Sequence, residues 1–161
     1  MLRECHRVLK DEGLLVFSYH HSREEGWQSL AKALSDAGFV VVNCQPVKAE
    51  MSVATPKSQA TEPIQLDIIV VCRKRHADFT AVSIEQALAR GHVKLRRLAN
   101  AGFALSRNDR KVVLFGQLLT AMSEPSEIAK FAIDIDGELN RPIDDTPRRR
   151  ERIQRDLIFR D

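Results

Sequence analysis

The chain has 161 residues, of which 43% are hydrophobic and 29% are charged. This is long enough for one compact domain, or for half of a larger one with an appendage, and the composition is that of an ordinary soluble protein. No run approaches the roughly 18 apolar residues of a membrane-spanning helix, and the charged N-terminus lacks a signal-peptide core. Three widely spaced cysteines without a CxxC pair argue against a disulfide framework or a zinc site and favour a reducing, cytoplasmic location.

The formal net charge of +3 conceals an uneven distribution. Residues 73–111 carry 10 Lys and Arg against 3 Asp and Glu, whereas residues 1–72 carry 7 against 9. A local excess of positive charge neutralises phosphates well and predicts a polyanionic partner. The alternative is a solvated, basic helix face without a ligand.

The first 75 residues alternate between helical and strand-like patterns. The expected elements are a helix over 2–10, a strand over 13–19, a helix over 24–37 ended by Gly38, and strands over 39–48 and 66–72. The first strand–helix–strand unit predicts a right-handed parallel crossover. The polar loop 51–63 contains no helix pattern, so the last two strands are expected to be antiparallel neighbours.

After residue 76 the pattern is entirely helical. Helices are expected over 81–99, with Gly91 as a weak point, over 107–122, and in a shorter segment ending near 139. Ser106 and Asp109 form a capping-box pattern at the start of the second of these helices. The expected units are therefore residues 1–76, a helical extension over 77–139, and a basic tail over 140–161 that forms either a terminal helix or a disordered segment.

A family resemblance is carried by four segments in this order: CHRVLKDEGLLVFSYHH, a tryptophan-containing helix, AGFVVVNCQPVKAE and LDIIVVCRKR. Together they resemble the C-terminal half of the Rossmann-like fold of S-adenosylmethionine-dependent methyltransferases, from its fifth to its seventh strand. The sequence SYHH, the Ser/Thr-rich loop and residues 100–109 resemble adenine-specific DNA methylases in particular. The resemblance implies an α/β fold in which an all-helical extension follows this partial sheet.

The motifs with which that family does its chemistry are missing from this sequence. The family binds its methyl donor at a glycine-rich turn and its target amino group at an Asp/Asn-Pro-Pro-Tyr/Phe motif. Here the seven glycines are never closer than 11 residues apart, and no Pro-Pro pair occurs. The resemblance thus implies that the intact enzyme uses S-adenosylmethionine, whereas this chain alone binds no cofactor and is inactive.

The apolar run of the first strand also requires hydrogen-bonding partners on both edges. The last strand supplies one of these edges. We expect the other to pair with the missing N-terminal half of the methyltransferase or with another copy of the chain.

Two groups of residues are candidates for the functional site. Tyr19, His20 and His21 follow the first strand at the edge where open α/β sheets place their sites, and they are candidates for lining a pocket. The alternative is that they are loop residues, with one imidazole capping the next helix. The candidates for DNA contact are Lys57, Arg73, Lys74, Arg75, Arg90, Lys94 and Arg97.

The remaining singled-out residues have structural interpretations. Trp27 is expected in the core, and the cysteines are expected to behave as small buried hydrophobic residues. Asp67, a charge within an apolar strand, either pairs with a basic neighbour or marks an exposed position.

The leading functional hypothesis is the C-terminal portion of a DNA N6-adenine or N4-cytosine methyltransferase. The alternatives are a non-catalytic nucleic-acid-binding or interaction subunit on a degenerate methyltransferase fold, and a parent enzyme that acts on a small molecule or a protein.

Overall fold

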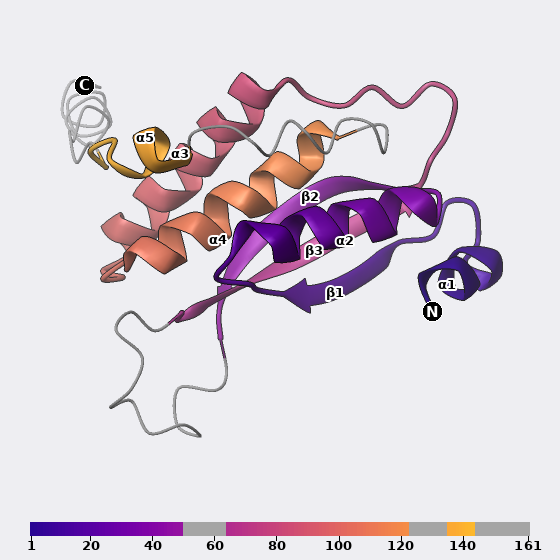
Figure 1. Ribbon diagram of the computed structural model, residues 1–161, viewed down its shortest axis with the longest axis horizontal. Helices are drawn as coiled ribbons and strands as arrows, with labels where there is room; N and C mark the ends of the chain where they lie inside the picture. The colour runs from indigo at the N-terminus through magenta and orange to yellow at the C-terminus, as the bar shows by residue number, and fades with distance from the viewer. Residues whose placement is uncertain (50–63, 123–134, 144–161) are drawn as a thin grey trace, which may run out of the picture.

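The computed structural model describes residues 1–49, 64–122 and 135–143 (Figure 1). Lys57, the whole of the 51–63 loop and most of the basic tail lie outside these ranges. The elements are α1 (Leu2–Val8), β1 (Leu15–Tyr19), α2 (Glu24–Asp36), β2 (Phe39–Lys48), β3 (Leu66–Lys74), α3 (Ile84–Asn100), α4 (Arg107–Leu118), the 3-10 helix η1 (Leu119–Ala121) and α5 (Ile135–Leu139).

The three strands form one sheet in the order β1-β3-β2, and β3 runs antiparallel to both neighbours. The expected antiparallel pairing of the last two strands is confirmed. β1 and β2 point in the same direction, as a parallel crossover unit requires, but they are not neighbours because β3 lies between them. The fold is therefore α/β with a three-stranded antiparallel sheet.

Helices cover one face of this sheet. Alternate residues of β3, Leu66, Ile68, Val70 and Cys72, are buried on that face. α2 and α4 pack against the strands there, and α3 packs on α4 as an outer layer (Figure 1). Trp27 of α2, fully buried as expected, stacks on Phe115 of α4 at a centroid distance of 5.9 Å.

One hydrophobic core joins the segment before residue 76 to the helices that follow it. Residues of β2 and β3 share this core with residues of α3, α4 and η1. The helical extension therefore covers the sheet and buries its apolar face, instead of standing apart from it.

Two glycines allow the close packing of these layers. A Cβ on Gly91 of α3 would lie 2.7 Å from Leu114 Cδ2 of α4, and one on Gly116 would lie 3.1 Å from Ile68 Cγ1 of β3. Gly91 was expected to be a weak point of the helix because glycine lowers helix propensity. In this structure the lack of a side chain at Gly91 allows α3 to pack closely against α4, because a larger residue would push the two helices apart.

The helix termini follow their sequence signals. Ser106 and Asp109 form the expected capping box, and Ser83 with Gln86 forms another at the start of α3. Gly38 has a φ of +81°, in the left-handed region expected of a residue that ends a helix. No helix in the described part of the chain is long and apolar enough to cross a membrane.

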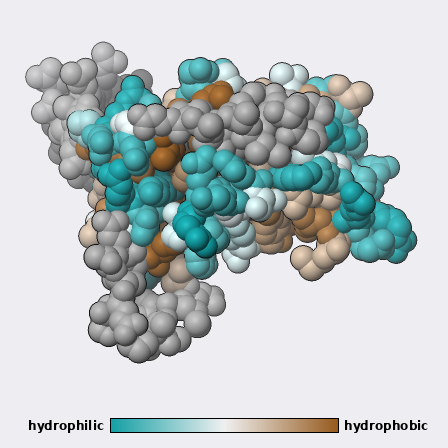
Figure 2. Space-filling view, in the orientation of Figure 1, coloured by the Kyte–Doolittle hydropathy of each residue, from teal (hydrophilic) through white to brown (hydrophobic). Residues whose placement is uncertain are grey.

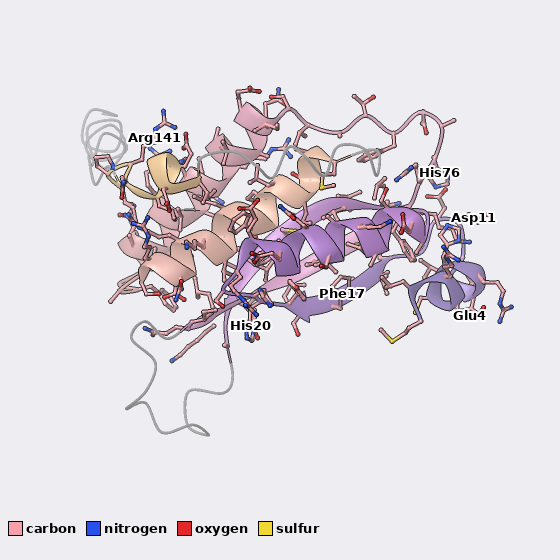
Figure 3. All side chains as sticks on the ribbon, in the orientation of Figure 1. Glu4, Asp11, Phe17, His20, His76 and Arg141 are labelled. Carbon is pink, nitrogen blue, oxygen red and sulfur yellow. The ribbon has the colours of Figure 1, made fainter. Side chains whose placement is uncertain are left out.

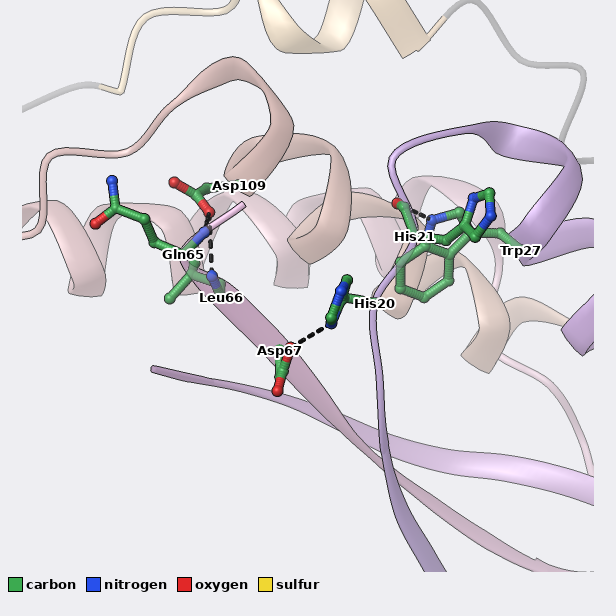
Figure 4. Close-up of polar contacts among 7 residues, drawn as sticks. All are labelled: His20, His21, Trp27, Gln65, Leu66, Asp67 and Asp109. Carbon is green, nitrogen blue, oxygen red and sulfur yellow. Dashed lines mark hydrogen bonds and ion pairs between the residues drawn. The ribbon is translucent and has the colours of Figure 1, made fainter. Parts of the chain in front are cut away.

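Asp109 also ties α4 to the sheet (Figure 4). Its side chain is 1% exposed. Oδ1 accepts hydrogen bonds from the backbone N–H groups of Gln65 at 2.7 Å and Leu66 at 3.2 Å, while Oδ2 accepts from Ser106 N at 3.0 Å. One carboxylate thus caps the helix and holds the beginning of β3.

Asp109→Ala is expected to lower the free energy of unfolding by about 3 kcal/mol, because buried N–H groups lose their acceptor. Asp36→Ala is the matched control, since that carboxylate lies on the surface in an i,i+4 pair with Lys32. The control is expected to change stability by less than about 0.5 kcal/mol. Urea unfolding followed by circular dichroism measures both, and equal losses would contradict the anchoring role of Asp109.

The cysteines differ in burial, and this predicts their reactivity. Cys44 and Cys72 are fully buried, whereas Cys5 is only partly buried. Burial raises the pKa of the Cys72 thiol to about 12 and also raises the pKa of Cys44 strongly.

At pH 8 a thiol reagent should therefore modify Cys5 alone in the folded protein and all three cysteines in denaturant. Rapid native labelling of Cys44 or Cys72 would contradict this arrangement.

Candidate functional site

Tyr19, at the end of β1, holds α2 against the strand. Its hydroxyl donates a hydrogen bond to the carbonyl oxygen of Gly26 at 2.9 Å. Its ring meets Trp27 edge-on, with centroids 5.0 Å apart and planes at 84°. Burial raises the pKa of this hydroxyl. Both the ring and the hydroxyl of this candidate pocket residue are thus engaged in packing.

His21 lies in the loop between β1 and α2, just before the N-cap residue of α2, Arg23. Its Nδ1 is 2.8 Å from the carbonyl oxygen and 3.0 Å from the amide nitrogen of Arg23, so either tautomer makes a hydrogen bond to that backbone. The carbonyl of His21 accepts a hydrogen bond from Trp27 Nε1 at 2.9 Å (Figure 4). These contacts give His21 a role in starting the helix, close to the alternative interpretation from the sequence.

His20 makes a different kind of contact. Its Nδ1 lies 2.5 Å from Oδ1 of Asp67 on β3, and the two side chains are 53% and 22% exposed (Figure 4). Asp67 therefore has a partner, as one of its two sequence interpretations required. A carboxylate that orients an imidazole in this way is part of many acid–base sites.

The residues around His20 and Asp67 determine which kind of ligand this pair can contact. No group of three or more potential metal ligands occurs among the described residues. One small cavity in the described region lies elsewhere, bordered by Ser35, Arg75 and Met122, and has room for at most one water molecule. His20 and Asp67 therefore form an open surface pair at the end of β1, able to contact a ligand that another surface holds in place.

Arg73, Lys74 and Arg75 lie at the other end of β3, close to the turn after α1. Arg73 Nη1 is 3.4 Å from Glu12 Oε2, and Lys74 Nζ is 3.1 Å from Asp11 Oδ1. Arg75 Nη2 donates to Ser35 Oγ at 2.7 Å. Figure 3 shows Asp11 at this end of the molecule, away from His20. The structure thus uses this candidate DNA-contact group to connect β3 with the N-terminal turn and α2.

Arg90, Lys94 and Arg97 form a second basic group on α3. Arg90 and Arg97 are exposed, and Lys94 Nζ donates to Gln45 Oε1 of β2 at 2.8 Å. The pKa of Lys94 is lowered, first by burial and then by the positive charges of Arg97 and Arg90, although Cys44 opposes this shift. We call these three residues the α3 basic face.

The α3 basic face differs from Arg73 and Lys74 at the end of β3 in its lack of acidic neighbours. Within the described ranges, no carboxylate lies within ion-pair distance of Arg90, Lys94 or Arg97. Six other Lys and Arg side chains each have such a carboxylate, namely Arg7, Lys32, Arg73, Lys74, Arg107 and Arg141. Three uncompensated charges on one helix face attract an anion.

The two edges of the sheet are a further feature that the sequence alone did not separate. β1 pairs with β3 on one side, and its other edge has no partner strand among the described residues. β2 is the opposite edge, with a bulge between Val41 and Asn43, a proline at position 46, and Lys48 at its end. Bulges, prolines and lysines protect natural edge strands from pairing. β1, with the sequence LVFSY, has none of these.

Comparison with known proteins gives no match to this chain, neither among models of protein families nor among curated proteins or solved structures.

Proposed function

We propose that this chain is the C-terminal portion of an S-adenosylmethionine-dependent DNA methyltransferase that acts on the N6 of adenine or the N4 of cytosine. It needs a second polypeptide segment for the reaction. The observation that carries the proposal is the strand order β1-β3-β2, in which the last strand enters between the two earlier ones and β1 keeps an open edge.

The strand order agrees with two expectations from the sequence. The resemblance implies that the last strand is antiparallel to the strand before it. The apolar run of the first strand separately requires a partner at each edge, and the last strand is expected to supply one of them. β3 does both, with Phe17 opposite Val70 on one side and Cys44 opposite Val70 on the other. An α/β arrangement of this kind is shared by methyltransferases of several substrate classes, and the choice of DNA rests on the sequence resemblance and on the basic charge.

The open edge of β1 supports a missing partner strand. β1 has no charged residue, and Val16 on its uncovered face is 52% exposed. Figure 2 shows hydrophobic residues along the lower border of the molecule, where β1 runs in Figure 1. An apolar, unprotected edge is a site for strand addition. In this proposal its occupant is a strand from the segment that carries the donor-binding and base-binding motifs.

The chemistry divides between the two segments accordingly. Methyl transfer forms a bond from the exocyclic nitrogen of the base to the methyl carbon of S-adenosylmethionine and breaks the carbon–sulfur bond of the donor. The nitrogen then loses a proton. This requires acceptors that align the amino group, and the Pro-Pro motif that supplies them in the family does not occur in this sequence. Its own contribution is the sheet edge, with His20 and Asp67 at the carboxyl end of β1, where open α/β sheets place their sites.

A second candidate function is a non-catalytic nucleic-acid-binding subunit. The observation that favours it is the α3 basic face, which lies on the outer helix layer and is independent of the edge of β1. The two candidates differ in whether the DNA upstream encodes a Pro-Pro-Tyr-type motif.

The purified chain alone is expected to bind no S-adenosylmethionine in isothermal titration and to transfer no tritiated methyl group to DNA. Together with an upstream-encoded segment that carries the missing motifs, it is expected to transfer the label. Micromolar binding of the donor by the chain alone would overturn the proposed division of labour. Absence of transfer by the combined segments, with both folded, would overturn the assignment as a methyltransferase.

The isolated chain is also expected to self-associate through β1 when no other strand occupies that edge. Val16→Lys places a charge beside the open edge and should weaken association at least tenfold in sedimentation velocity. Val47→Lys is the matched control, because Val47 is also an exposed valine on the uncovered face but belongs to the protected strand β2. A monodisperse wild-type monomer with a cooperative melting transition would contradict the open-edge interpretation.

A further inference from the structure

We infer that the α3 basic face, and not the basic cluster at the end of β3, is the surface that binds the phosphate backbone of double-stranded DNA. The choice of duplex DNA as the polyanion rests on the proposed function. The location of the surface rests on the charges and contacts of the described residues.

The charges of the α3 basic face lie on one side of a helix. Arg90, Lys94 and Arg97 follow at intervals of four and three residues, which places them side by side. They extend over about 10 Å, because a helix rises about 1.5 Å per residue. One strand of B-DNA carries a phosphate about every 3.4 Å of axis, so this face lies against roughly two or three phosphates.

Lys94, the central residue, is held in position before any ligand binds. Its ammonium group donates to Gln45 of β2, and its side chain is only partly exposed. Burial, followed by the flanking Arg97 and Arg90, lowers its pKa. No carboxylate within the described ranges lies at ion-pair distance from this ammonium group. A phosphate at this position supplies the missing negative charge, and little side-chain entropy is lost on binding.

The opposite side of α3 argues for a polyanion and against a lipid surface. The apolar residues of α3, including Ala87, Leu88 and Leu95, are buried against the core. Membrane-surface helices need an exposed apolar side that enters the bilayer beside their basic one. α3 has used its apolar side for packing, so its outer side offers charge and hydrogen-bond donors.

The basic cluster at the end of β3 lacks these properties. Arg73 and Lys74 face Glu12 and Asp11, and both acidic side chains are more than 80% exposed. A phosphate approaching this cluster meets those carboxylates, whose repulsion offsets the attraction. The seven sequence candidates for DNA contact are thereby reduced to the three on α3, with Lys57 outside the described residues.

The test compares two triple variants that change the net charge equally. One is Arg90→Gln with Lys94→Gln and Arg97→Gln. The control is Arg7→Gln with Lys32→Gln and Arg141→Gln, three surface residues that each have a carboxylate neighbour. Binding of a fluorescein-labelled 20-base-pair duplex is measured by anisotropy between 50 and 200 mM salt, after circular dichroism has shown that all proteins are folded.

The α3 variant is expected to bind at least tenfold more weakly than wild type at 100 mM salt. The slope of log K against log salt should fall by about two to three, because each phosphate contact contributes about 0.9. The control should stay within about twofold of wild type. Equal losses in the two variants, or salt-dependent binding of anionic vesicles or RNA without binding of the duplex, would overturn the inference.

Failure of the inference is distinguishable from failure of the proposed function. Duplex binding that depends on α3, without methyl transfer by the combined segments, would overturn the methyltransferase assignment alone. Methyl transfer that survives the α3 triple variant, with an unchanged salt slope, would overturn the location of the DNA surface alone.

Discussion

The structure depends on the position of β3 between β1 and β2. As the central strand, β3 is hydrogen-bonded on both sides, and its alternate residues Ile68, Val70 and Cys72 are fully buried beneath the helices. Its beginning is fixed by Asp109 of α4, whose carboxylate accepts two backbone N–H groups of that strand. Because the same carboxylate caps α4, the helix and the strand are held in one mutual position. The sheet and the helices that follow it therefore behave as a single packed unit.

A central β3 also determines which edges of the sheet are available. It occupies one side of each neighbour, so the outer sides of β1 and β2 become the two edges. The edge strand β2 contains a bulge, Pro46 and Lys48. In addition, Lys94 of α3 donates a hydrogen bond to Gln45 of this strand. β1 has no comparable device and exposes Val16. The unpaired N–H and C=O groups of such an edge strand favour pairing with another strand. This is the physical basis for the partner segment in the proposed function.

The same packing sorts the basic residues into two groups. At the end of β3, Arg73 and Lys74 form ion pairs with Glu12 and Asp11 of the turn after α1. Those on α3 lie on the outer helix layer, where burial of the apolar side against α4 leaves Arg90 and Arg97 exposed and Lys94 half-buried beside Gln45 of β2. Gly91 contributes directly, because the absence of a side chain lets α3 approach Leu114 closely. Part of the excess charge of the middle of the chain thus lies on a helix face that can meet a polyanion.

The sequence by itself determined the local features of this protein. Apolar runs located the strands, the Ser106–Asp109 pattern located the start of α4, and Gly38 located the end of α2, because each depends on residues close together in the chain. Contacts between residues that are far apart in the sequence were decided only by the tertiary structure. It paired His20 with Asp67, gave Asp109 its second role at β3, and engaged Tyr19 in packing against α2. It also separated two basic groups that looked alike as sequence, because neutralisation depends on which carboxylates the fold brings within a few ångströms.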